Sequence, residues 1–237
     1  TDTQRIGIIF RHSILKSYFP PITTERILEI KAGNRLDMTF QLPIQVGHDN
    51  VVCLTPCDGA AFYQKTIPMT ALTEKTSTLS YYLNDPEVRK VAWQNRARNL
   101  AWTAEPNIGH KSLVQLQQRG VLRAVATQNV DGLHQKAGNH PEIVHELHGT
   151  MHVAVCWDCK DTHPMRAAVE RVLAGDSDPK CLLCGGILKS DTILFEESLK
   201  QHVIEAALLA ADECDVLLVV GSSLRVYPAA NIVPRAK

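Results

Sequence analysis

The sequence predicts an α/β fold in which a small cysteine-rich module is inserted between two parts of a parallel β-sheet. Short continuous apolar runs alternate with segments of helical periodicity, which is typical of a parallel sheet covered on both faces by helices. Two cysteine pairs, CWDC and CLLC, interrupt this alternation in a stretch with little hydrophobic periodicity. That stretch is therefore expected to lie outside the sheet.

The predicted strands are apolar runs bounded by turn residues. They are expected at 51–55, 121–127, 142–149, 191–195 and 214–221. Because most of these runs show no alternation of apolar and polar residues, both faces of the sheet should be buried.

The predicted helices carry recognisable start and stop signals. The segment 85–102 has Asp85 as its N-cap and Pro86 in its first position. Ser198 is expected to cap a second helix at 198–213. Other helices are expected at 20–34, 106–120, 131–138 and from residue 227 onward.

Composition limits the classes of function. The chain has 237 residues, of which 45% are apolar, and its 25 Lys and Arg balance its 25 Asp and Glu. A formal net charge of zero gives no electrostatic case for non-specific binding to nucleic acid or to an anionic membrane. The apolar runs are too short to span a bilayer. The seven cysteines are too few for a disulfide-stapled secreted domain, so a reducing compartment, the cytoplasm, is expected.

The cysteine spacing predicts a structural zinc site. Two thiolates of one CxxC pair can reach one metal ion, and two such pairs complete a tetrahedral shell. The expected ligands are Cys156, Cys159, Cys181 and Cys184. Two redox-active CxxC pairs are the alternative for the same residues. A nucleic-acid-binding zinc module is disfavoured, because acidic rather than basic and aromatic residues gather around these cysteines.

Three predicted strands end in polar or small residues. Gln128, Asn129 and Asp131 follow the strand at 121–127, and His148 ends the strand at 142–149. The third strand leads into Gly221, Ser222 and Ser223. Ligands of open parallel sheets bind outside the carboxyl ends of the strands, so these residues are expected to line one crevice.

Two of these strand ends suggest specific chemistry. Gly221 allows close approach of the backbone, and the two serines after it supply donors, which suits a phosphate group. The neutral imidazole of His148 would make a good general base near neutral pH.

Four motifs together resemble the sirtuin family of NAD-dependent protein deacylases. They are TQNVDGLHQKAG, ELHG, the CxxC…CxxC pair and GSSLRVYPAAN, in this order and spacing. The resemblance implies a Rossmann-like parallel sheet with an inserted small zinc-binding module, and NAD and acyl-lysine meeting in the cleft between them. The implied organisation is an N-terminal segment of unclear role (1–50), the first part of the NAD-binding domain (51–149), the zinc module (150–190) and the return to the NAD-binding domain (191–237).

The resemblance also implies a role for each site residue. Gln128 and Asn129 would contact the nicotinamide ribose, and Asp131 would line the nicotinamide pocket. His148 would be the general base acting on a ribose hydroxyl. Gly221, Ser222 and Ser223 would hold the ADP part of NAD. Phe195, Glu196, Arg225 and Val226 would flank the acyl-lysine peptide, which would pair with the chain as an added strand.

The implied reaction is NAD-dependent deacylation of protein lysine. The acyl oxygen attacks C1′ of the ribose as nicotinamide leaves, and the products are lysine, nicotinamide and O-acyl-ADP-ribose. The implied partners are an acylated-lysine protein or peptide and NAD, with no nucleic acid and no membrane. Zinc would be structural.

Two features depart from the family pattern. The family has a glycine-rich loop, GAGIS…SGIPDFRG, where this chain has TPCDGAAFYQK, in which Gly59 is the only glycine and Pro56 removes a backbone donor. The family also continues with a further strand beyond the position of Lys237. Two alternatives therefore stay open: a catalytically impaired scaffold that binds partner proteins, and an NAD-dependent mono-ADP-ribosyltransferase. The acidic Glu196, where most sirtuins have Gly, makes the nucleus the alternative compartment.

Overall fold

The computed structural model describes residues 6–10, 44–46, 51–54, 71–220, 222 and 226–236. The expected helix at 20–34 and the divergent loop at 56–66 lie outside these residues. So do three expected site residues, Gly221, Ser223 and Arg225.

A six-stranded sheet forms the centre of the large lobe. Its order is β2 (Ile44–Val46), β3 (Val51–Leu54), β9 (Val216–Val220), β1 (Ile6–Phe10), β4 (Leu122–Thr127) and β5 (Val144–Glu146). Every neighbouring pair is parallel except β2 with β3, which is antiparallel. The predicted parallel sheet is thereby confirmed.

Two strands of this sheet come from the first fifty residues, for which the sequence predicted no strand. Strand β1 lies between β9 and β4, with Ile8 opposite Leu218 on one side and Val125 on the other. Strand β2 adds an antiparallel edge beside β3. The N-terminal segment therefore contributes to the same sheet as the later strands.

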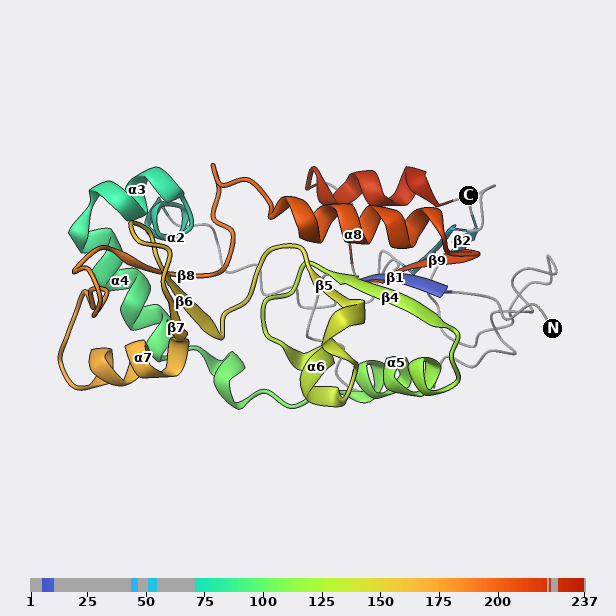
Figure 1. Cartoon of the computed structure of the whole chain (residues 1–237), viewed down its shortest axis with the longest axis horizontal. Helices are drawn as coiled ribbons and strands as arrows, with labels where there is room; N and C mark the ends of the chain where they lie inside the picture. The colour runs from blue at the N-terminus through green and yellow to red at the C-terminus, as the bar shows by residue number, and fades with distance from the viewer. Residues whose placement is uncertain are drawn as a thin grey trace.

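Helices cover both faces of the sheet. Helices α5 (Ile108–Gln118) and α6 (Leu133–Ala137) lie on one face, and α8 (Gln201–Asp212) and the 3₁₀ helix η3 (Ala229–Arg235) lie on the other (Figure 1). The second pair packs on the sheet through one apolar cluster that includes Ile204, Ile232 and Val219. Among the helices that the structure describes, none is long and apolar enough to cross a membrane.

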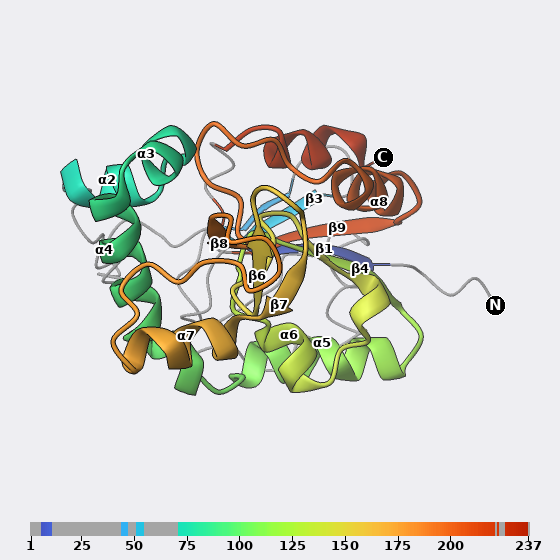
Figure 2. The same ribbon diagram turned by 60° about the vertical axis from the view of Figure 1, so that its left-hand side comes forward.

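The cysteine-rich module forms a small lobe beside the sheet (Figure 2). Its core is a three-stranded antiparallel sheet of β6 (Val153–Cys156), β7 (Thr162–Pro164) and β8 (Leu188–Ser190), with β6 in the middle. Helix α7 (Met165–Leu173) belongs to the module itself, whereas α2 (Ala71–Thr76), α3 (Leu79–Asn84) and α4 (Pro86–Ala97) precede it in the chain. Trp93 of α4 packs against Cys156, Met165 and Leu188, so these helices share its core.

The segment 191–195, predicted as a strand, is not one. Strand β8 ends at Ser190, and the following residues form a loop that makes one bridge, between Phe195 and Thr78. The ammonium of Lys189 donates to the carbonyl oxygens of Ser190 and Thr192, at 2.8 and 2.7 Å. The Lys189 side chain thus occupies two carbonyl oxygens that would otherwise be available for hydrogen bonds with a neighbouring strand.

Several predicted helix ends were also wrong. Helix α8 begins at Gln201 after Lys200, so Ser198 is not its N-cap. The segment from residue 227 forms a 3₁₀ helix that contains Pro234, which has no N–H to donate to an α-helical bond. Asp85 does cap α4, accepting from the backbone N–H groups of Glu87 and Val88, but α4 ends at Ala97. A 3₁₀ turn, η1 (Leu100–Thr103), follows α4, and a second, η2 (Pro141–Ile143), precedes β5.

Candidate functional site

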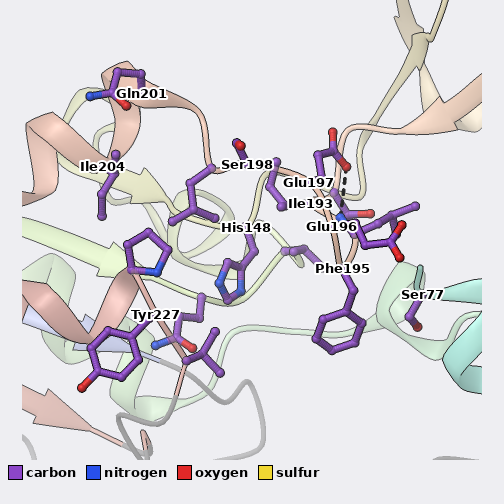
Figure 3. A pocket seen from close by; sticks show the side chains of 17 residues that line it. Ser77, His148, Ile193, Phe195, Glu196, Glu197, Ser198, Gln201, Ile204 and Tyr227 are labelled. Atoms are coloured by element: carbon purple, nitrogen blue, oxygen red, sulfur yellow. Dashed lines mark hydrogen bonds between the residues drawn. The ribbon is translucent and has the colours of Figure 1, made fainter. Parts of the chain in front are cut away.

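A cavity of about 930 Å³ lies between the carboxyl ends of the strands and the loop that leads from β8 to α8. Among the residues that the sequence singled out, Gln128, His148, Phe195, Glu196 and Val226 line it. Figure 3 shows His148 near the middle, with Phe195 and Tyr227 on either side of it. The structure therefore brings strand ends far apart in sequence into one site.

The two residues that follow β4 supply polar side chains next to the cavity. Gln128 and Asn129 are buried directly after Thr127, whose hydroxyl oxygen accepts a hydrogen bond from the Asn129 N–H at 3.1 Å. The side-chain amide of Gln128 lies 3.4 Å from the hydroxyl of Ser222, which follows β9. The residues that follow β4 and β9 are therefore in contact.

Two buried polar atoms at the end of β4 lack a hydrogen-bond partner among the described residues. They are the amide oxygen Oε1 of Gln128 and the amide nitrogen Nδ2 of Asn129. Leaving a buried acceptor and a buried donor unpaired costs free energy, so such pairs are seldom left without a ligand or water. One acceptor and one donor side by side suit a ligand rich in hydroxyl and amide groups, as NAD is.

Asp131 occupies a different position from Gln128. Its carboxylate accepts from the N–H of Leu133, the first residue of α6, at 3.0 Å. Its carbonyl oxygen lies 2.8 Å from Nε2 of His152. Asp131 lines a second, smaller cavity of about 390 Å³ together with Trp102 and His152. The residues that the structure describes around the main cavity do not include it.

His148 stands on a firmly held backbone two residues after β5, which ends at Glu146 and not at Gly149 as the sequence predicted. The Leu147 N–H donates to Thr127 at 2.8 Å, and the His148 carbonyl accepts from the Ile193 N–H at 2.8 Å. Gly149 follows in the left-handed region, with φ of 72°. Since the backbone is fixed on both sides, the half-buried imidazole is directed into the cavity (Figure 3).

Gly149→Ala is expected to destabilise the fold by about 3 kcal/mol or more. A Cβ at this position would lie 1.9 Å from the Asp191 carbonyl oxygen, and the positive φ adds strain. Gly120→Ala is the matched control, because Gly120 has the same φ of +72° and nothing within 4 Å of its Cβ position. Urea denaturation should show that the control loses only about 1–2 kcal/mol of its free energy of unfolding. Equal losses in the two variants would contradict the contact with Asp191.

The loop after β8 forms one wall of the cavity. Its backbone is already paired at Phe195, whose N–H donates to the Ser77 carbonyl at 2.8 Å and whose carbonyl accepts from the Leu79 N–H at 3.0 Å. The Phe195 ring remains 60% exposed, and the Tyr227 ring across the cavity is 72% exposed. A peptide that adds a strand here would therefore pair with the residues after Phe195.

A buried ion pair holds this loop, and sequence inspection missed it. Lys189 is 1% exposed, and its ammonium lies 3.0 Å from the carboxylate of Glu197, which also accepts from the Leu194 N–H. Burial lowers the pKa of Lys189, and Glu197 works in the opposite direction. The available signal was a lysine within the largely apolar run ILKSDTILF.

The four expected metal ligands meet in the small lobe. Their sulfur atoms lie within 4.8 Å of one another, with 3.5 Å between Cys156 and Cys184 and 3.8 Å between Cys159 and Cys181. A tetrahedron with zinc–sulfur bonds of about 2.3 Å has edges of about 3.8 Å. Cys156, Cys159, Cys181, Cys184 and Cys214 form no disulfide. The geometry fits a four-thiolate zinc site.

A buried histidine pair between α5 and α6 is expected to make the fold sensitive to acid. His134 of α6 packs against His110 of α5, with 4.7 Å between ring centroids. Burial, and secondly the nearby His110, lower the pKa of His134 to about 3. In the unfolded chain a histidine has a pKa of about 6.5, so below that pH the unfolded state binds the extra proton.

The free energy of unfolding should therefore fall as the pH drops below about 6.5, by up to about 1.4 kcal/mol per pH unit from His134 alone. Urea denaturation between pH 7 and pH 5 measures this slope. His134→Gln should reduce the slope by that amount, whereas the same change at the exposed His202 should leave it unaltered. An unchanged slope in His134→Gln would show that His134 is not buried in its neutral form.

Known proteins resemble this chain in sequence and in fold. Residues 60–228 match the model of the Sir2 family. The chain is 45% identical over 159 residues to NAD-dependent protein deacetylase 2 of Streptomyces coelicolor, covering 67% of this chain and 66% of the relative. For two further curated relatives the chain spans 51% and 60% of their length.

Solved structures share the fold. The structure of Sir2Af2 bound to a myristoylated histone peptide is 36% identical with a TM-score of 0.58, covering 69% of this chain and 67% of that one. A structure from work on the mechanism and regulation of Sir2 enzymes is 28% identical with a TM-score of 0.65, covering 98% of this chain and 77% of that one.

Proposed function

This chain belongs to the Sir2, or sirtuin, family, and we propose that it is an NAD-dependent protein lysine deacylase. It would consume NAD, acyl-lysine and one water molecule, and it would release nicotinamide, deacylated lysine and O-acyl-ADP-ribose. The similar Streptomyces protein is named as an NAD-dependent protein deacetylase, and the Sir2Af2 structure holds an acylated histone peptide. Both names support a reaction in which NAD and an acyl-lysine peptide meet.

The observation that carries the proposal is the cavity at the carboxyl edge of the parallel sheet. It joins a candidate base, His148, to a loop that connects the two lobes. Next to it, the unpaired acceptor of Gln128 and the unpaired donor of Asn129 fit the hydroxyl and amide groups of NAD. An apolar pocket with a few convergent polar groups is the usual form of a small-molecule site.

Each residue of the site then has a task. NAD, when bound, supplies the ribose carbon that takes the acyl oxygen. Gln128 and Asn129 hold the ribose side of the dinucleotide, and Ser222 lies beside Gln128 for the ADP part. His148 accepts a proton from a ribose hydroxyl at a ring nitrogen. Phe195 and Tyr227 offer aromatic walls for the acyl-lysine chain.

We further propose that Cys156, Cys159, Cys181 and Cys184 hold one zinc ion whose task is structural. Four thiolates fill a tetrahedral shell and leave no position for a substrate. The backbone N–H groups of Cys159 and Gly186 point at two of the sulfurs, at 3.5 and 3.4 Å, and stabilise their negative charge. The metal would hold the small lobe together.

The deciding experiment is product analysis with NAD and an acetyl-lysine peptide. A deacylase forms nicotinamide and deacetylated peptide in equal amounts, and only when both substrates are present. ADP-ribose bound covalently to protein, with the acetyl group left in place, would favour the transferase alternative. Peptide binding without any product would favour the impaired scaffold.

A further inference from the structure

Glu196 has an unusual backbone at the edge of the main cavity. Its φ of 72° lies in the left-handed region, which among the described non-glycine residues is shared only by Lys160. This conformation strains any residue that carries a Cβ. Strained residues that line a cavity are candidates for function, because the surrounding structure holds them in place. Glycine would adopt this conformation without strain, but this chain has a glutamate at the position.

The small lobe holds the Glu196 carboxylate in a defined position. The backbone N–H of Ser80, in α3, donates to Oε2 at 3.0 Å. The adjacent Phe195 is bridged to Thr78, so the backbone beside Glu196 is fixed as well. One carboxylate oxygen thus anchors the side chain, and Glu196 stays at the exposed rim of the cavity.

Glu196 is also the carboxylate at this rim whose charge is not balanced within the described structure. The neighbouring Glu197 is paired with Lys189 at 3.0 Å, and Asp191 is paired with Lys200 at 2.6 Å. No Lys, Arg or His of the described ranges lies within ion-pair distance of Glu196. Within the described residues, the loop therefore leaves one negative charge, that of Glu196, unbalanced at the mouth of the cavity.

The walls around this charge suit a cationic side chain. The ring of Phe195, the residue before Glu196, is 60% exposed on the same side of His148, whereas the exposed ring of Tyr227 lies on the opposite side of the cavity (Figure 3). Aromatic faces attract ammonium and guanidinium groups. Apolar walls also weaken the screening of a nearby charge by water.

We infer that this site prefers acyl-lysine in a basic sequence, with a Lys or Arg within two residues of the acyl-lysine that pairs with Glu196. Residues of an extended peptide advance by about 3.3 Å each, so two positions place a side chain about 7 Å along the groove. A basic side chain at one of these positions would then lie at the rim while the acyl-lysine enters the cavity. The inference deepens the proposed deacylase function and rests on it for its readout by turnover.

The experiment uses matched acetyl-lysine peptides that differ only at positions −2, −1, +1 and +2. Each position is Lys, Arg, Ala or Glu in turn. At the preferred position, kcat/KM for the basic peptide should exceed that for the alanine peptide by roughly two- to fivefold, as expected of a partly exposed ion pair. The difference should lie in KM rather than kcat, and it should shrink as salt is raised.

Glu196→Gln isolates the charge. The amide oxygen of Gln can still accept from the Ser80 N–H, so the anchor of the side chain is kept while its charge is removed. In this variant the ratio of basic to alanine peptide should fall to about one. Glu170→Gln is the matched control, since Glu170 lies on α7 with a side chain that is 68% exposed. The control should keep the wild-type ratio.

Peptide binding measured by fluorescence anisotropy without NAD separates the two proposals. If no peptide is turned over but basic peptides bind more tightly in a way that needs Glu196, the proposed activity fails and this inference stands. If peptides are turned over with equal efficiency, or if Glu196→Gln keeps the preference for basic ones, the inference is overturned. Absence of both binding and turnover overturns both.

Discussion

Replacing His148 with alanine is expected to lower kcat/KM for deacylation by about 10²–10⁴-fold, the usual contribution of a general base. The imidazole lines the main cavity, and the backbone on both of its sides is fixed by hydrogen bonds to Thr127 and Ile193. Alanine leaves those backbone bonds in place, so the variant should fold normally. The loss would then come from the missing proton acceptor.

The measurement is the rate of deacetylated peptide formation at saturating NAD. His140→Ala is the matched control, because His140 is an exposed histidine, 62% accessible, in the turn before β5. It should keep the wild-type rate. Urea denaturation of both variants shows whether they are folded. Deacylation that persists within a few-fold in His148→Ala would contradict its role as the base.

Removing the metal from the cysteine cluster is expected to unfold the small lobe. Structural zinc in small modules contributes about 10 kcal/mol or more, as much as the whole stability of many domains. Cys156 and Cys181 are buried in the same core as Trp93 and Met165, so loss of the metal would expose that core. Natively purified protein should contain about one zinc per chain.

Tryptophan fluorescence offers a specific readout of this lobe. The chain has three tryptophans, and all of them belong to the lobe or pack on it: Trp93, Trp102 and Trp157. A strong chelator, or Cys181→Ser, should shift their emission towards that of exposed tryptophan and abolish the bound metal. Cys214→Ala, at a buried cysteine of the large lobe, should keep both the metal and the emission. Metal-free protein with native emission would contradict a structural role for zinc.

Sequence patterns succeeded where the determining interactions are local. The apolar run at 121–127 became β4, the one at 214–221 became β9, and Asp85 caps α4 as expected. The polar residues after β4 and β5 could be placed together, because parallel strands bring their carboxyl ends to one edge. The cysteine spacing likewise predicted a cluster that the fold assembles.

The failures involve partners that lie outside the predicted segment itself. Strand β1 is central only because β9 and β4 pair with it, and its five residues carry no local signal of that position. The run 191–195 looks like a strand, but a lysine at 189 and a carboxylate at 197 fold it into a loop. The positive φ of Glu196 is equally invisible in the sequence, because tertiary contacts impose it.

The loop that forms one wall of the cavity is also one of the covalent connections between the lobes. It leaves β8 in the small lobe and enters α8 in the large one. The ion pair between Lys189 and Glu197 joins residues near its two ends. The width of the main cavity therefore depends on the positions of the two lobes relative to each other. A structural zinc ion that takes no part in the chemistry would therefore still affect the width of this cavity, because it holds the small lobe together. Partial loss of zinc should then appear first as a rise in KM for peptide, before kcat changes.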